Sequence, residues 1–196
     1  MEYKGRFRMS WTIEAKVQPL VGIAGHLYLD IFDDEGKRVV QINGFSFSDR
    51  TNKITSIGTP EDKLKAYVTD KVVLVETSGR DRDHQPHDGH VIFSGKKEDV
   101  LEVIAALKEL AEEFNEKDFL YRAFSFNSNT VFSAMVHRIS QIVPVDMEAV
   151  DKTIALQKIT PGVKTKLLRN QTSLTEVFNQ GEKGSGKTPR PPKPAP

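Results

Sequence analysis

The sequence contains no cysteine among its 196 residues. Disulfide bonds, thiolate zinc sites and a cysteine nucleophile are therefore excluded. It also lacks any run of about 18 apolar residues, so we expect no transmembrane segment. The opening residues 1–6, MEYKGR, are polar, and we expect no Sec-type signal peptide. We accordingly expect a protein that is cytoplasmic in the producing cell, or exported by a route that needs no Sec signal peptide.

A large excess of either charge is also absent. Hydrophobic residues make up 38% of the chain and charged residues 28%, and the net charge is +1. This composition is typical of a soluble globular protein. Residues 181–196 hold four basic residues and one acidic residue, which leaves a net charge of −2 for the rest. The body is therefore no polyanion-binding surface, and no nucleic-acid partner is predicted.

Strand patterns dominate the first half of the chain. Alternating or β-branched runs bounded by turn residues predict strands over 8–19, 21–32, 38–47, 71–77 and 90–94. The sequence DDEG at 33–36 predicts a turn that joins the second and third strands as a hairpin.

Helical patterns follow the strands. Apolar residues spaced three and four apart predict a helix over 97–116. A second helix is predicted from about Asn129 to just before Pro144, and a short one over 146–158. Strands followed by helices indicate an α+β fold, an antiparallel sheet packed against two or three helices. We expect one domain over 1–180 and a disordered Gly/Lys/Pro-rich tail over 181–196.

The tail contains two motifs. Residues 181–188, GEKGSGKT, fit the P-loop pattern, but that loop binds phosphate only where a helix follows it. Prolines follow at once, and proline inside a helix costs about 3 kcal/mol, so no nucleotide cofactor is predicted. Residues 189–194, PRPPKP, have the PxxP spacing of polyproline II ligands. They indicate either a protein partner with an aromatic groove or a solubilising tail.

Three histidines lie close together at His84, His87 and His90, among several aspartates. Such a density of ligands is compatible with zinc or nickel. Pro86 and Gly89 make the segment a loop, and zinc sites usually recruit a ligand from a second element. An exposed polar loop is therefore the preferred interpretation, and no metal site is predicted.

The start of the second helix offers a candidate nucleophile. Ser128 lies in the run 127–130, NSNT, where four side chains could each serve as the helix N-cap. Because one cap needs only one of them, Ser128 is available for a second role. The dipole and free N–H groups of a helix N-terminus stabilise a developing oxyanion, which points to Asn127 and Asn129 as oxyanion or substrate-binding residues.

A serine nucleophile needs a base, and His26 is the best candidate. It lies in an otherwise apolar strand, where it could equally be a buried histidine of the core. A third group must orient the imidazole. Asn43 on the neighbouring strand, with Gln41 behind it, is the nearest polar choice, since hairpin pairing would place Asn43 opposite His26.

The order of these residues resembles that of circularly permuted papain-like enzymes, the permuted NlpC/P60 type, which include lecithin retinol acyltransferase-like and PPPDE-like members. Those enzymes carry a histidine on an early strand, a polar residue on the next strand and a nucleophile at the start of a late helix, commonly within Asn-Cys-Asn or Asn-Cys-Glu. The matching segments are NSNTV at 127–131 and GHLY at 25–28. The resemblance covers about residues 20–142.

The resemblance implies a hydrolase or acyltransferase acting on an amide or ester bond, with cell-wall peptides or acyl lipids as substrates and no cofactor. A bacterial effector is one setting that fits a small chain without a signal. Ser128 stands where the family has cysteine, which leaves three alternatives: a genuine Ser-His hydrolase, a natural pseudo-enzyme, or a Cys-to-Ser knockout. A non-catalytic binding module that recruits a protein partner is the competing hypothesis.

Overall fold

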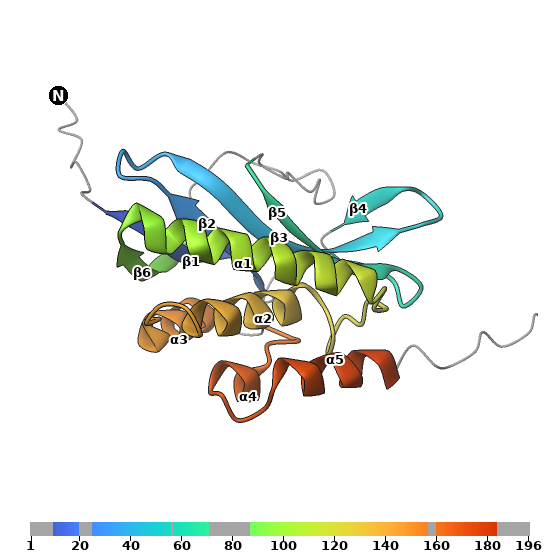
Figure 1. The fold of residues 1–196 in the computed structure, drawn as a ribbon. Helices are drawn as coiled ribbons and strands as arrows, with labels where there is room; N and C mark the ends of the chain where they lie inside the picture. Colours follow the sequence, from blue (N-terminus) through green and yellow to red (C-terminus); the bar gives the residue numbers. More distant parts are fainter. Residues whose placement is uncertain (1–9, 20–24, 56, 71–86, 157–159, 184–196) are drawn as a thin grey trace, which may run out of the picture.

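A computed structural model describes residues 10–19, 25–55, 57–70, 87–156 and 160–183. Within these ranges the chain forms a six-stranded antiparallel sheet and five helices, and the helices gather on one side of the sheet (Figure 1). The α+β fold predicted from the sequence is confirmed. The predicted strand at 71–77 lies outside the described residues.

The elements are β1 Trp11–Pro19, β2 Gly25–Phe32, β3 Arg38–Ser48, β4 Lys53–Thr55, β5 Lys63–Thr69, β6 Gly89–Gly95, α1 Lys97–Glu116, α2 Ser128–Ser140, α3 Met147–Ala155, α4 Thr165–Leu168 and α5 Leu174–Lys183. Four of these elements, β4, β5, α4 and α5, were not predicted from the sequence. No helix in the described ranges is both long and apolar enough to cross a membrane.

The long strand β3 organises the sheet. It pairs with β2 only as far as Leu29 opposite Ile42, and further along it pairs with β4 through Ser46–Ser48. On its other edge it pairs with β5 through Gln41–Phe47. Strands β2 and β3 therefore separate after Ile42, and the start of β2 has no β3 partner.

One face of the sheet forms the main hydrophobic core. Because side chains alternate along a strand, the odd-numbered residues of β1 and β2 share a face. Ala15, Val17, Leu27 and Leu29 on that face are buried and belong to the core shared with the helices. The even-numbered residues therefore point to the opposite face of the sheet.

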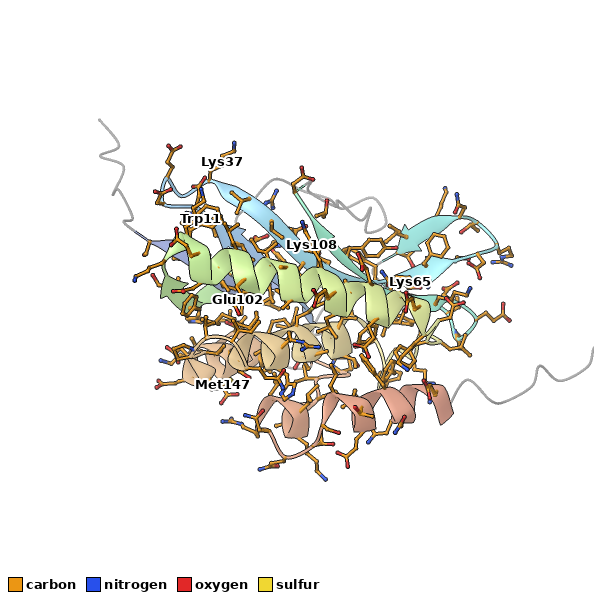
Figure 2. The ribbon with its side chains drawn as sticks, viewed as in Figure 1. Trp11, Lys37, Lys65, Glu102, Lys108 and Met147 are labelled. Carbon is orange, nitrogen blue, oxygen red and sulfur yellow. The ribbon has the colours of Figure 1, made fainter. Side chains whose placement is uncertain are left out.

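Helices α1 and α2 cover the core face in different ways. Helix α1 presents one apolar stripe to the sheet and keeps charged side chains such as Glu102 and Lys108 on its solvent side (Figure 2). Helix α2 is buried on nearly all sides, because it packs against β2 and β3, against α1 and against α4. Its buried residues include apolar side chains such as Val131, and also polar ones such as Asn129 and Ser133, which are hydrogen-bonded.

The C-terminal helix α5 packs on a cluster of four phenylalanines, Phe114, Phe119, Phe126 and Phe178, whose ring centroids lie 4.9–6.1 Å apart in five contacts. Gly181 of this helix is buried, and a Cβ there would lie 2.6 Å from Phe126 and 2.7 Å from Phe119. Glu182 also pairs with Lys117 at 3.0 Å. The ordered fold thus continues three residues into the segment predicted as a tail. A helix, rather than a strand, leads into the P-loop-like sequence.

Candidate functional site

The first turn of α2 is capped by its own neighbours. The Asn127 side chain accepts a hydrogen bond from the Asn129 backbone N–H at 2.9 Å, and the Thr130 hydroxyl accepts one from the Asn127 N–H at 3.2 Å. This reciprocal arrangement is a capping box, which satisfies N–H groups that a helix start otherwise leaves unpaired. The N–H of Asn129, predicted to stabilise an oxyanion, is therefore already occupied by the cap.

The side chain of Asn129 anchors α2 to the sheet where β2 and β3 separate. Its Oδ1 accepts from the Leu27 N–H at 2.8 Å, and its Nδ2 donates to the Gly25 carbonyl at 3.0 Å. These peptide groups flank His26 on β2. The side-chain amide of Asn129 thus makes the hydrogen bonds to β2 that a neighbouring strand would otherwise make. The same Nδ2 also donates to the Pro161 carbonyl at 2.9 Å.

The loop before α4 clamps the same helix start. The Pro161 carbonyl accepts from the Asn127 Nδ2 at 3.0 Å as well, and the Gly162 carbonyl accepts from the Thr130 hydroxyl at 2.9 Å. Gly162 has a φ of +83°, and a Cβ there would lie 2.1 Å from the Asn127 Oδ1. Glycine is therefore required by both the backbone conformation and the close contact. Asn127 is a structural residue of this clamp.

Gly44 on β3 allows α2 to approach the sheet closely. A Cβ at this position would lie 2.7 Å from two side-chain carbons of Val131 and 2.9 Å from the Ser128 Cα. Ser128 is 4% exposed, and its hydroxyl makes no hydrogen bond within the described part of the chain. The candidate nucleophile therefore lies against the bare backbone of β3.

We expect the substitution Gly44→Ala to destabilise the fold by about 1–3 kcal/mol. The new methyl group would overlap the Ser128 backbone and a β-branched side chain, neither of which yields easily. Urea unfolding measures the effect, and Gly36→Asn in the exposed 33–36 turn is the control, because no atom lies within 4 Å of its Cβ position. Equal stability of wild type and Gly44→Ala would contradict the close contact.

His26 is held as a neutral, buried imidazole. It is 1% exposed, and its Nε2 lies 3.0 Å from the Asn43 Oδ1. Because an amide oxygen can only accept, Nε2 carries the proton. Its Nδ1 is buried and has no hydrogen-bond partner among the described residues. Burial lowers the pKa of His26 to about 4, the hydrogen bond to Asn43 opposes this, and the nearby His87 adds to it.

Ser128 lies on one face of the sheet, and the side chain of His26 points to the other face. Gly44 faces α2, because its Cβ position meets Ser128. Its neighbours Asn43 and Phe45 therefore point the other way. Both of them contact His26, through the hydrogen bond above and through ring stacking with centroids 5.3 Å apart. The structure brings His26 and Asn43 together but does not provide the direct Ser128–His26 contact expected from the sequence.

Gln41 makes its side-chain hydrogen bond to an aspartate rather than to His26 in the described part of the chain. It is buried, and its Nε2 donates to the Asp30 Oδ1 at 3.1 Å. Arg38 lies 3.7 Å from the same carboxylate oxygen. Burial raises the pKa of Asp30, while Gln41 and Arg38 lower it. Gln41 thus belongs to a polar row beside the His26–Asn43 pair, and its predicted role stays a prediction.

Two of the three clustered histidines make ordinary structural contacts. His87 Nδ1 lies 2.7 Å from the Tyr28 hydroxyl, and His90 Nδ1 lies 3.0 Å from the Thr153 hydroxyl. His84 lies outside the described residues. Among the residues that are described, no group of three or more acidic or histidine side chains could hold a metal ion.

Sequence reasoning missed the structural partners of this site. Gly44, Pro161 and Gly162 position the start of α2, and none of them was a candidate. The sequence Pro161-Gly162 is an evident turn signal, but its contact with Asn127 joins residues about 34 apart, which no local pattern reveals. Gly44 interrupts an apolar strand, and an isolated glycine in a strand often marks a close backbone approach.

Comparisons with known proteins identified no relative of this chain. No family model matches the chain, and neither the curated proteins nor the solved structures contain a match. The papain-like relationship therefore stays a prediction from the residues.

Proposed function

We propose that this protein is a non-catalytic binding module that recruits a protein partner through its proline-rich C-terminal sequence. The observation that carries this proposal is the arrangement around His26. Its imidazole is bonded to Asn43 on the face of the sheet away from α2, and the Asn129 N–H is used by the helix cap. These structural hydrogen bonds account for His26, Asn43 and Asn129 without a catalytic role.

The C-terminal sequence supports the proposal from a second side. Residues 189–194 contain two overlapping PxxP spacings with Arg190 and Lys193 between the prolines. Polyproline II segments bind aromatic grooves with little loss of conformational entropy, because they are extended beforehand. Helix α5 is fixed to the body by the phenylalanine cluster. It ends at Lys183, close to these prolines in the sequence.

A binding experiment with isolated polyproline-reading domains tests this function. Purified SH3 and WW domains are titrated against the full chain and followed by calorimetry. We expect saturable binding by at least one domain, loss of binding when Pro191 and Pro192 are both replaced by alanine, which breaks both PxxP spacings, and no change with Ser128→Ala. Failure of all domains of both classes to bind would overturn the proposal.

A hydrolase or acyltransferase of papain-like type is the second candidate. Its support is the His26–Asn43 pair, in which an amide fixes the imidazole and leaves Nδ1 bare. A neutral imidazole with a free nitrogen is chemically able to act as a general base. For Ser128 to use it, the contact between α2 and β3 must open, since no hydrogen bond links the two residues within the described structure.

Labelling with a fluorophosphonate probe and hydrolysis of amide and ester panels test this candidate. The binding-module proposal predicts no labelling and no turnover above that of Ser128→Ala. Labelling that disappears in both Ser128→Ala and His26→Gln would favour the hydrolase, because a reactive serine without a base is a poor nucleophile.

A further inference from the structure

We propose that Arg122 and Lys164 form a binding site for a small oxyanion, a carboxylate or phosphate group, in front of the first turn of α2. This site is distinct from the proline-rich sequence and from the His26–Asn43 pair. Here the folded part of the chain, rather than its proline-rich sequence, binds the ligand.

The two cations are brought together by the turn that precedes α2. Arg122 and Phe126 face each other across this turn, with backbone hydrogen bonds of 2.8 and 3.0 Å. Lys164 belongs to the loop before α4 that also contains Pro161 and Gly162. Its Nζ lies 5.6 Å from the centre of the Phe126 ring. Arg122 and Lys164 thus both lie beside Phe126, although 42 positions separate them in the sequence.

Neither cation has an acidic partner in the described part of the chain. The ion pairs there involve other residues, and the Nη2 of Arg122 is buried without a hydrogen bond. Burial, and then the charge of Arg122, lowers the pKa of Lys164. A buried guanidinium nitrogen without an acceptor is costly, so Arg122 together with a second cation that has no acidic partner in the described part of the chain indicates a missing anion.

The surroundings add to the positive potential. The first turn of α2 contains no acidic residue, and the positive end of its dipole lies at Asn127, directly after Phe126. Arginine offers paired N–H donors that match the oxygens of carboxylate and phosphate, and lysine adds a point charge. Phe124, at the tip of the same turn, is 87% exposed.

Thermal unfolding of the full chain in phosphate, acetate and chloride tests the proposal. The three sodium salts are compared at equal ionic strength, because chloride reports general screening alone. We expect phosphate, acetate or both to raise the melting temperature above its value in chloride, with saturation as the site fills. The relative size of the two responses distinguishes a phosphate-type from a carboxylate-type ligand.

Variants localise the response. Lys164→Met keeps an unbranched side chain over Phe126 and removes the charge, and Arg122→Gln removes the guanidinium. We expect each to lose at least four fifths of the anion-dependent shift. Lys166→Met, on the exposed side of α4, should keep it. The proposal is overturned if wild type responds no more than it does to chloride, or if either Lys164→Met or Arg122→Gln retains the full response.

Discussion

Replacing Asn129 by alanine should destabilise the fold by roughly 3–5 kcal/mol. The amide of Asn129 is buried and satisfies the Leu27 N–H, the Gly25 carbonyl and the Pro161 carbonyl. Each buried polar group left without a partner costs about 1–3 kcal/mol, and the first two belong to a strand that has no β3 neighbour there. Urea unfolding of wild type and variant measures the difference.

The matched control for this prediction is Asn179→Ala. Asn179 is an exposed helical residue of α5, so the same chemical change should alter the free energy of unfolding by less than about 0.5 kcal/mol. Asn129→Asp adds a second test, because it keeps the acceptor for Leu27 and removes both donated hydrogen bonds. If Asn129→Ala were as stable as Asn179→Ala, the anchoring role of Asn129 would be disproved.

Acid should destabilise the protein through His26 by roughly 3 kcal/mol. The pKa of this imidazole falls from 6.5 in the unfolded chain to about 4 in the fold, chiefly because burial disfavours the charged form. Between these values the unfolded chain binds a proton that the folded chain does not. The stability contributed by neutral His26 is therefore complete above pH 6.5, falls as the pH drops, and is lost below pH 4.

The variant His26→Gln isolates this contribution. It keeps a side chain able to bond Asn43 and removes the titration. The free energy of unfolding, measured in urea between pH 4 and 7, should therefore fall less steeply with acid than in wild type. His137 serves as an internal control. Burial lowers its pKa too, and its effect on the pH dependence of stability is the same in wild type and in His26→Gln. Parallel pH profiles for wild type and His26→Gln would show that His26 is not the group responsible.

Local periodicity predicted the elements that pack on the core with long, regular patterns. The stripe of α1 predicted Lys97–Glu116, and the turn at 33–36 predicted the hairpin of β2 and β3. The helix predicted over 146–158 is observed as Met147–Ala155. In each case the apolar residues recur within a few positions, so a short window contains the whole signal.

Some missed elements carried usable signals. In β5, Leu64 and Ala66 are buried and alternate with half-buried lysines, which is a strand pattern. Before α5, Ser173 and Glu176 form a reciprocal pair, with the Ser173 N–H donating to Glu176 at 2.9 Å and the Glu176 N–H donating to Ser173 at 3.1 Å. That is the capping-box spacing, three residues apart.

The geometry of the candidate site could not be read from the sequence. The sequence placed Asn43 opposite His26 by hairpin pairing, but β2 and β3 pair only as far as Leu29 opposite Ile42, so the observed His26–Asn43 hydrogen bond lies beyond the paired part of the hairpin. The face that His26 occupies depends on the long-range contact of Gly44 with α2, and that contact joins segments more than 80 residues apart. Neighbouring positions on a strand point to opposite faces, so a correct strand with an unknown face leaves the partner of His26 undetermined.

The most direct test of the central claim compares the protonation of the His26 ring in wild type and in Ser128→Ala. Long-range nitrogen–proton NMR spectra report which ring nitrogen carries the proton and at what pH the ring titrates. We predict a proton on Nε2 and a pKa near 4 in wild type, unchanged in Ser128→Ala and altered in Asn43→Ala. A change in the Nδ1 signal or a pKa shift of one unit or more in Ser128→Ala would contradict the claim that the two residues act in separate contacts.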